Sequence, residues 1–361
     1  MEYLEGMKRL FSLFLGSLFF FSSLGAENKA YDQIVHEAIK EMMEQRSVPG
    51  AAVALYYDGQ THLYHYGVMN QKTKQRVSEE TIFALGPLTK GFTATLLALE
   101  IEKGEMALDA PVIRYIPAEK FRDNLAMKRI TLEELATHTS GLPRWPNVGA
   151  RKLQNFSKGD LMDWLAKWRP SYPPGTEWKD SDMGYGVLGC AIVEAGGASY
   201  RRILHRQILF PLGMSSTYLQ LPWYKQKVFA RGYNRKGDPV SHWERRGWVE
   251  AVSLLSTSPD MACFLKANLD AKGIPKNLAG AMALTQKVRF EKGDIRQGLA
   301  WTMVEVEGVD LVVQEGHANG FSCGIALDPE RRVGVVVLSN KSDASAGKVS
   351  QSIARSILHR E

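Results

Sequence analysis

The stretch "FALGPLTKGFTATLLALE", Phe83–Glu100, predicts a long apolar helix with a lysine, Lys90, in its first turn. The helix is expected to start near Pro87, because proline is favoured in a first turn, where a missing N–H costs no hydrogen bond. It is expected to end at Lys103-Gly104, since glycine commonly follows a helix C-terminus. What Lys90 does there depends on the segments that the fold brings beside it.

Strand patterns lie on both sides of this helix in the sequence. The segment "PGAAVALYYDGQTHLYHYGVMN", residues 49–70, predicts two strands joined at Asp58-Gly59, a pair typical of tight hairpins. Helical spacing predicts a helix over residues 31–46 before them and a final helix after about residue 345. Three short apolar runs near the C-terminus predict three further strands: Leu311–Gln314, Phe321–Leu327 and Val333–Leu338.

These patterns predict an α/β fold, an αβα sandwich whose antiparallel sheet is built from both termini, with a mostly helical insert beside it. The α/β part is expected at about residues 27–85 and 300–361, and the helical part at about 86–299. The composition, 45% hydrophobic and 23% charged over 361 residues, is ordinary for a globular protein with a substantial core.

The N-terminus has the pattern of a secretory signal peptide. Two basic residues precede the apolar run "LFSLFLGSLFFF", Leu10–Phe21, and small residues follow up to Ala26. We expect residues 1–26 to be the signal, and residues 27–361 to form a periplasmic or secreted domain with no stable membrane span. An uncleaved anchor is the alternative, although the run is short for a span, which needs about 20 apolar residues.

Charge and cysteine content argue against several functions. The formal net charge of +6 is scattered, with no basic stripe or nucleic-acid-binding module, so no nucleic-acid partner is expected. The three cysteines, Cys190, Cys263 and Cys323, stand among apolar or small residues and are expected to be buried free thiols. We expect no cofactor and no metal.

Seven short segments occur in an order typical of one family: "THTSGLP", "PPGT", "GYGVLG", "PLGM", "STSPDMACFL", "QGLAW" and "VVVLSN". In these segments the chain resembles the serine β-lactamases and penicillin-binding proteins, most closely class C β-lactamases and the related esterases and DD-peptidases. The resemblance extends from about residue 30 to residue 355. It implies the β-lactamase-like αβα sandwich and a site built from three motifs.

The first family motif is Ser-x-x-Lys, in which the serine attacks a carbonyl and the lysine helps to remove its proton. The matching residues here run from Pro87 to Lys90, so the lysine is kept and the hydroxyl is lost. In the family, the backbone N–H of the nucleophile is also one donor of the oxyanion hole. Proline has no N–H, and the loss of one such donor typically costs about 100- to 1,000-fold in rate.

The second family motif is Tyr-x-Asn, in which the tyrosine acts as acid and base and the asparagine holds the substrate amide. Here Asp180 and Asp182 stand at the two functional positions. A carboxyl side chain with an ordinary pKa near 4 does not replace a tyrosine with a pKa near 10. Ionised Asp182 cannot donate a hydrogen bond as asparagine would.

The third family motif is Lys-Thr-Gly, which binds the substrate carboxylate and aligns the acyl chain. Counting back without gaps from Gly320 places Gln314, Glu315 and Gly316 there. A rival register, like the His-x-Gly of the esterases, starts at His317 and needs a deletion, so the ungapped register is preferred.

The charges at these positions are reversed relative to the family. Lys90 stands against Asp180, Asp182 and Glu315, one positive and three negative charges, which sum to −2. This sum predicts an acidic pocket that disfavours a carboxylate ligand, with Lys90 and Asp180 as a possible internal pair. The same acids and His317 could hold a cation, but the loops that carry them are far apart in the sequence.

Other hydroxyl and imidazole groups are interpreted as structural. Thr89 lies off the nucleophile position, and Ser181 is the middle residue of the second motif. Ser345 and Lys348 match Ser-x-x-Lys by spacing, but Ser345 is expected to cap the last helix. His138 is expected to be a satisfied structural histidine.

Two functions are compatible with these substitutions. The first is an exported, non-catalytic or repurposed binding protein that takes a small-molecule or cell-wall-derived ligand. The second is an active hydrolase of the family with a rearranged site, for example with Asp180 and Glu315 activating a water molecule. The departures at Pro87, Asp180, Asp182, Gln314 and Glu315 favour the first.

Overall fold

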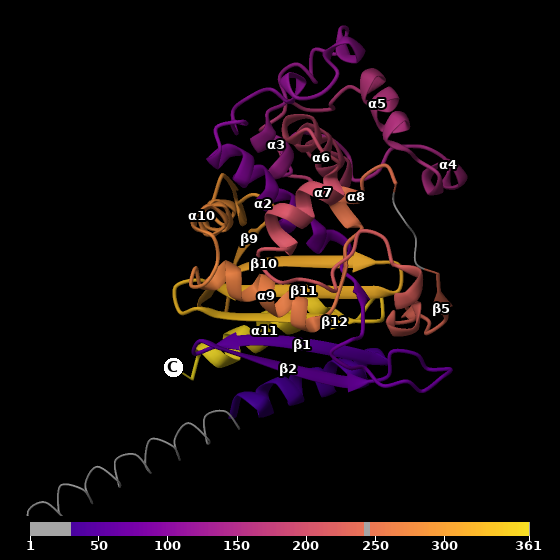
Figure 1. Cartoon of the computed structure of the whole chain (residues 1–361), viewed down its shortest axis with the longest axis vertical. Helices are drawn as coiled ribbons and strands as arrows, with labels where there is room; N and C mark the ends of the chain where they lie inside the picture. The colour runs from indigo at the N-terminus through magenta and orange to yellow at the C-terminus, as the bar shows by residue number, and fades with distance from the viewer. Residues whose placement is uncertain (1–29, 242–245, 361) are drawn as a thin grey trace, which may run out of the picture.

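The computed structural model of the chain describes residues 30–241 and 246–360 (Figure 1). The predicted signal peptide, residues 1–26, lies outside the described residues. Within them, one antiparallel sheet of eight strands crosses the middle of the molecule, with the helical region on one side (Figure 1). In sheet order the strands are β2 (Gln60–Gly67), β1 (Gly50–Tyr57), β12 (Val333–Ser339), β11 (Phe321–Asp328), β10 (Val309–Ala318), β9 (Thr302–Val306), β8 (Ile295–Gln297) and β7 (Phe290–Lys292).

The central strands are apolar on both faces because each face packs against helices. In β1, Ala51, Val53 and Leu55 pack in one core cluster, whereas Ala52, Ala54 and Tyr56 pack in the other. This alternation follows from the two-residue period of a strand, and burial on both faces explains the continuous apolar run.

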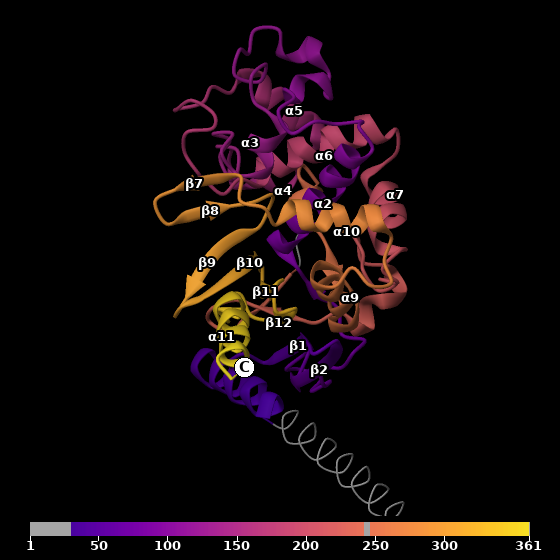
Figure 2. The ribbon, with the colours of Figure 1, turned by 90° about the vertical axis from the view of Figure 1, so that its left-hand side faces the viewer.

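Helices from the two ends of the chain cover one face of the sheet. The N-terminal helix, residues 30–46, and α11 (Ala346–Leu358) share a core cluster with β1, β10 and β12. Figure 2 shows α11 on one side of the sheet and α9 on the other. The predicted αβα sandwich, with a sheet built from both termini and the hairpin at Asp58-Gly59, is therefore confirmed.

The helical region covers the other face. Its helices are α2 (Thr89–Glu102), α3 (Leu132–Ala136), α4 (Ala150–Gln154), α5 (Lys158–Lys167), α6 (Asp182–Gly196), α7 (Tyr200–Leu204), α8 (Val249–Val252), α9 (Ser258–Leu269) and α10 (Lys276–Thr285). A π-turn (His205–Leu209) and short 3-10 turns lie between them: η1 (Gly86–Leu88), η2 (Val112–Arg114), η3 (Ala118–Phe121) and η5 (Trp223–Val228). Two small two-stranded sheets pair β3 (Phe83–Ala84) with β6 (Leu255–Ser256) and β4 (Gly232–Tyr233) with β5 (Pro239–Val240).

Two predicted boundaries differ from the structure. The C-terminal part of the main sheet starts at Phe290, not at about residue 300, because the short hairpin β7–β8 adds to its β9 edge. Pro87 lies in the 3-10 turn η1, and the α-helix starts only at Thr89. The two segments are nevertheless continuous, since Leu88 and Thr89 keep helical backbone angles.

Helix α2 is buried on every side rather than along one face. All residues from Thr89 to Glu100 are buried, including Lys90, which is 2% exposed. A helix that is buried on every side is a core helix. A lysine in its first turn therefore requires compensating charges from its neighbours.

Candidate functional site

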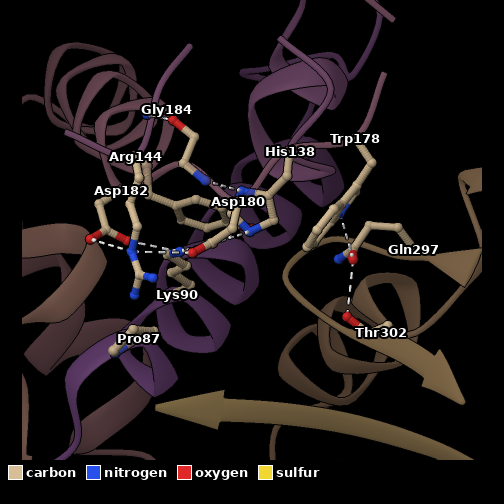
Figure 3. Close-up of polar contacts among 12 residues, drawn as sticks. Pro87, Lys90, His138, Arg144, Trp178, Asp180, Asp182, Gly184, Gln297 and Thr302 are labelled. Carbon is tan, nitrogen blue, oxygen red and sulfur yellow. Dashed lines mark hydrogen bonds and ion pairs between the residues drawn. The ribbon is translucent and has the colours of Figure 1, made fainter. Parts of the chain in front are cut away.

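A pocket of about 360 Å³ lies where the start of α2 meets the segment before α6 and strand β10. Its lining includes Pro87, Lys90, His138, Arg144, Asp180 and Gln314. Figure 3 shows Pro87, Lys90 and Arg144 at one end of this group, and Trp178, Gln297 and Thr302 at the other. The fold thus brings the first two predicted motifs together with part of the third.

Lys90 forms two ion pairs at the inner end of the pocket. Its Nζ lies 2.5 Å from Oδ1 of Asp180 and 2.9 Å from Oδ1 of Asp182. The side chains of Lys90 and Asp182 are each 3% exposed, whereas Asp180 is 34% exposed at the pocket wall. The predicted Lys90–Asp180 pair is present, and Asp182 is a second partner of the same ammonium group.

Arg144 adds a second cation, which the sequence analysis did not identify. Its Nε lies 3.4 Å from Oδ2 of Asp180 and 3.7 Å from Oδ2 of Asp182. The indole Nε1 of Trp145 also donates to Oδ2 of Asp182, at 3.0 Å. These four charged groups sum to zero, two positive and two negative. The predicted sum of −2 omitted Arg144 and included Glu315, which lies outside this cluster. With both residues counted, these positions sum to −1, and the inner cluster alone is neutral.

His138 connects this cluster to the start of α6. Its Nδ1 accepts a hydrogen bond from the backbone N–H of Ser181 at 3.1 Å, which leaves the proton of the neutral ring on Nε2. That Nε2 lies 3.6 Å from Oδ1 of Asp180. Burial, reinforced by the positive charge of Lys90, lowers the pKa of His138 to about 3. The ring is a neutral structural group, as expected, but one in contact with the site.

Asp180 stays ionised throughout the ordinary pH range. Burial opposes its ionisation, but the charge of Lys90, its hydrogen bond, and Arg144 outweigh burial and hold the pKa at about 2. A carboxylate with so low a pKa and with both oxygens facing cations is a weak base.

Pro87 occupies the position at which the family has its nucleophilic serine. Pro87 lines the pocket as part of η1, and its carbonyl accepts a weak hydrogen bond, 3.4 Å, from Nε2 of Gln314. Gln314 is 7% exposed, so its amide is packed against the start of α2. At Gly316, an added Cβ would lie 2.2 Å from the carbonyl oxygen of Leu85, which shows how closely β10 approaches this turn.

Glu315 and His317 face away from Gln314 because side chains alternate along a strand. An added Cβ at Gly347 would meet the Glu315 carboxylate, and Nε2 of Gln351 donates to its Oε1 at 3.2 Å. Nε2 of His317 lies 3.7 Å from Oε2 of Glu315. This polar contact is the main cause that lowers the pKa of Glu315 and raises that of His317. Both residues line the pocket at its mouth.

Strand β10 presents a free edge to the pocket. Its pairing with β9 runs from Val309 to Val313 and stops there, whereas its pairing with β11 continues to Ala318. Among the residues that the structure describes, residues 314–318 therefore have no strand neighbour on the β9 side. An extended ligand could add main-chain hydrogen bonds at such an edge.

The remaining candidate groups are structural. The hydroxyl of Thr89 donates to the carbonyl of Gly86 at 2.7 Å, and that of Ser181 caps α6 by accepting from Gly184 N. The expected capping by Ser345 is wrong, because this residue has a left-handed φ of 58° and its side chain makes no cap hydrogen bond. Instead, Ser322 Oγ accepts from the N–H of Ala346.

The described residues also bear on the expectations for cysteines, metal ligands and membrane-spanning helices. The three cysteines are free, and only Cys323 is fully buried; Cys190 and Cys263 are partly exposed. Among residues 30–241 and 246–360, no group of three or more His, Cys, Asp or Glu could hold a metal ion. In the same part of the chain, no helix has the length and apolar composition needed to cross a membrane.

The fold agrees with comparisons to known proteins. The beta-lactamase family model matches residues 35–356, so the chain belongs to the beta-lactamase family, the serine β-lactamase and penicillin-binding-protein group that the sequence resembles. A beta-lactamase of Lysobacter lactamgenus is 28% identical over 98% of this chain and 98% of its own length.

Solved structures give the same result. A class C beta-lactamase superposes with a TM-score of 0.84 and 27% identity, covering 91% of this chain and 96% of that chain. A beta-lactamase/D-alanine carboxypeptidase from Pseudomonas syringae gives a TM-score of 0.82 and 27% identity, covering 91% and 99%.

Proposed function

We propose that this chain is an exported member of the family that does not carry out serine acyl transfer and binds a small-molecule or cell-wall-derived ligand in its pocket. The observation that carries the proposal is Pro87, which supplies neither the attacking hydroxyl nor the backbone N–H of an oxyanion hole. The signal-like N-terminal sequence supports export.

The surroundings of Pro87 support the same proposal. Lys90, which in a working site would take up a proton, is instead enclosed between Asp180 and Asp182. The pocket-lining hydroxyl of Thr302 donates to Oε1 of Gln297 at 3.0 Å. This partner is an amide, which cannot act as the general base that activates a hydroxyl.

The alternative of an active hydrolase requires a general base. Asp180 has its pKa held at about 2 by two cations, so it is poorly matched to accept a proton near neutral pH. Glu315 lies on the opposite face of β10 from Gln314 and is hydrogen-bonded to Gln351. These contacts place the two carboxylates in separate ion-pair clusters rather than around one water molecule.

Intact-mass measurement after incubation with a penicillin tests the proposal. We expect the mass of the protein to stay unchanged, and a chromogenic cephalosporin to be hydrolysed no faster than in buffer. An active class C β-lactamase handled in parallel serves as the positive control. A stable acyl adduct mapped to any serine or threonine, or turnover that follows the purified protein, would overturn the proposal.

A further inference from the structure

The guanidinium group of Arg144 is held from one side only. Its Nε faces the carboxylates of Asp180 and Asp182, at 3.4 and 3.7 Å. Within residues 30–241 and 246–360, Nε is the atom named in both ion pairs, and the two terminal nitrogens make no hydrogen bond. Figure 3 shows these nitrogens pointing away from the carboxylates and toward Pro87. The side chain is 42% exposed, so this end of the group is open to the pocket.

The open end of Arg144 has the geometry that suits an anion. The two terminal nitrogens of a guanidinium group form a planar fork that pairs with both oxygens of a carboxylate. Its fixed Nε, together with the stacking of Arg144 over the Trp145 ring at 5.3 Å, restricts the orientation of this fork. An arginine held in this way loses less conformational entropy when it binds a ligand.

The charges around the guanidinium group of Arg144 are compatible with the binding of one anionic group. Lys90 and Arg144 balance Asp180 and Asp182, so a carboxylate that binds Arg144 meets a neutral cluster. At the mouth, Nε2 of His317 lies 3.7 Å from Oε2 of Glu315, and this contact raises the pKa of His317.

Apolar as well as polar side chains line the rest of the pocket, where Gln297 and Thr302 lie beside Trp178 (Figure 3). The apolar part of the lining consists of Ala300, Val304 and Val313, together with the indole of Trp178. The Nε1 of Trp178 donates to Oε1 of Gln297 at 3.0 Å, which fixes the orientation of the ring. Figure 3 shows Trp178 across the group of side chains from Arg144. A volume of about 360 Å³ accommodates a small organic molecule.

We propose that the pocket binds a small organic acid, with its carboxylate on the terminal nitrogens of Arg144 and its apolar or aromatic body toward Trp178. This inference rests on the proposed function, since it concerns a ligand that is bound and released without acylation. Arg144 is the residue that selects the ligand by charge. The ion pairs with Asp180 and Asp182 position its side chain.

Binding of benzoate and benzamide to the purified full chain tests the proposal, by ligand-observed NMR and by calorimetry. The two probes have the same ring and differ in charge. We expect benzoate to bind reversibly and benzamide to bind at least tenfold more weakly, because the amide cannot form a charged bidentate pair. Equal binding of the two probes, or no benzoate binding at millimolar concentration, would overturn the proposal.

Three variants assign the effect to Arg144. Arg144→Gln should weaken benzoate binding at least tenfold. Arg144→Lys, which keeps the charge but not the fork, should also bind benzoate more weakly than the wild type. Arg129→Gln, a matched change at an exposed arginine outside the pocket, should leave binding unchanged. Wild-type affinity in both folded Arg144 variants would refute the assignment, whereas an acyl adduct in the mass experiment would refute only the proposed function.

Discussion

Lys90 on α2 and Asp182 at the start of α6 form an ion pair of 2.9 Å that is almost completely enclosed, with 3% of each side chain exposed. Asp180 shares the same ammonium group at 2.5 Å. A lysine in this position joins two helices of the core through charge. It therefore contributes to the fold, whatever chemistry the pocket supports.

The first prediction concerns the stability that depends on Lys90. Lys90→Met should lower the free energy of unfolding by about 3–5 kcal/mol, because it leaves the buried carboxylate of Asp182 and the half-buried one of Asp180 with Arg144 as their remaining cation. Lys40→Met is the matched control, since Lys40 and Glu44 are 63% and 68% exposed and 4.0 Å apart. Lys40→Met should change the free energy of unfolding by no more than about 0.5 kcal/mol. Urea unfolding of both variants measures the two losses of free energy. Equal losses would contradict the claim that the buried ion pair of Lys90 stabilises the fold.

The second prediction concerns pH. The pKa of His138 is about 3 in the folded protein against an ordinary value of 6.5. Between these two pH values, His138 is therefore protonated in the unfolded chain and neutral in the folded one. Stability from this residue is present above pH 6.5 and is lost as the pH falls toward 3. The slope is at most about 1.4 kcal/mol per pH unit.

His138→Asn provides the comparison, because asparagine tolerates the left-handed backbone, φ 64°, of this residue. The denaturation midpoint of this variant should depend less on pH between 6.5 and 4 than that of the wild type. Asp180, with a pKa near 2, contributes its own loss of stability only below about pH 4. Parallel pH profiles for the two proteins would mean that His138 is not held neutral.

The third prediction concerns the close approach of β10 to η1. Gly316→Ala should destabilise the protein by more than about 2 kcal/mol, because its Cβ would lie 2.2 Å from the backbone oxygen of Leu85. Gly159→Ala in α5 is the control, since its Cβ meets only Ser157 Oγ at an ordinary 3.6 Å. The control should be neutral or stabilising by up to about 1 kcal/mol. The melting temperatures of the two variants test this. If Gly316→Ala melted at a higher temperature than Gly159→Ala, β10 would be able to move away from η1.

The fourth prediction concerns reversal of the proline substitution. Pro87→Ser restores a hydroxyl and an N–H, yet it should not restore hydrolysis of a chromogenic cephalosporin. Lys90 remains bound to Asp180 and Asp182, and Gln314 remains where the family has a cation. Appreciable turnover by this single variant would mean that the other motif positions retain a catalytic arrangement.

Much of the fold could be predicted from local patterns. The hairpin at Asp58-Gly59 and the three C-terminal strands have sequence periods and turn residues that leave few alternatives. The short strands β7 and β8 were missed, because three residues each carry too little periodicity to distinguish them from loop.

The site was less accessible to sequence analysis. Pro87, Lys90 and the two aspartates could be assigned by their place in motifs, but Arg144 follows Pro143 in a loop and looks like any surface arginine. Only the fold brings its Nε to the two carboxylates. Ser345 has the residue type of a helix cap, but its left-handed backbone keeps its hydroxyl from the helix N-terminus. Neither feature is a property of local sequence.

The early end of the β9–β10 ladder has a practical consequence. Along one strand, residues 309–313 are flanked on both sides, whereas residues 314–318 are open toward the pocket. Amide hydrogens on the open side should exchange rapidly with deuterium in the empty protein and slow down once the pocket is filled. Strand β10 thus contains both a reference segment and a reporter segment, so occupancy can be measured before the natural ligand is known.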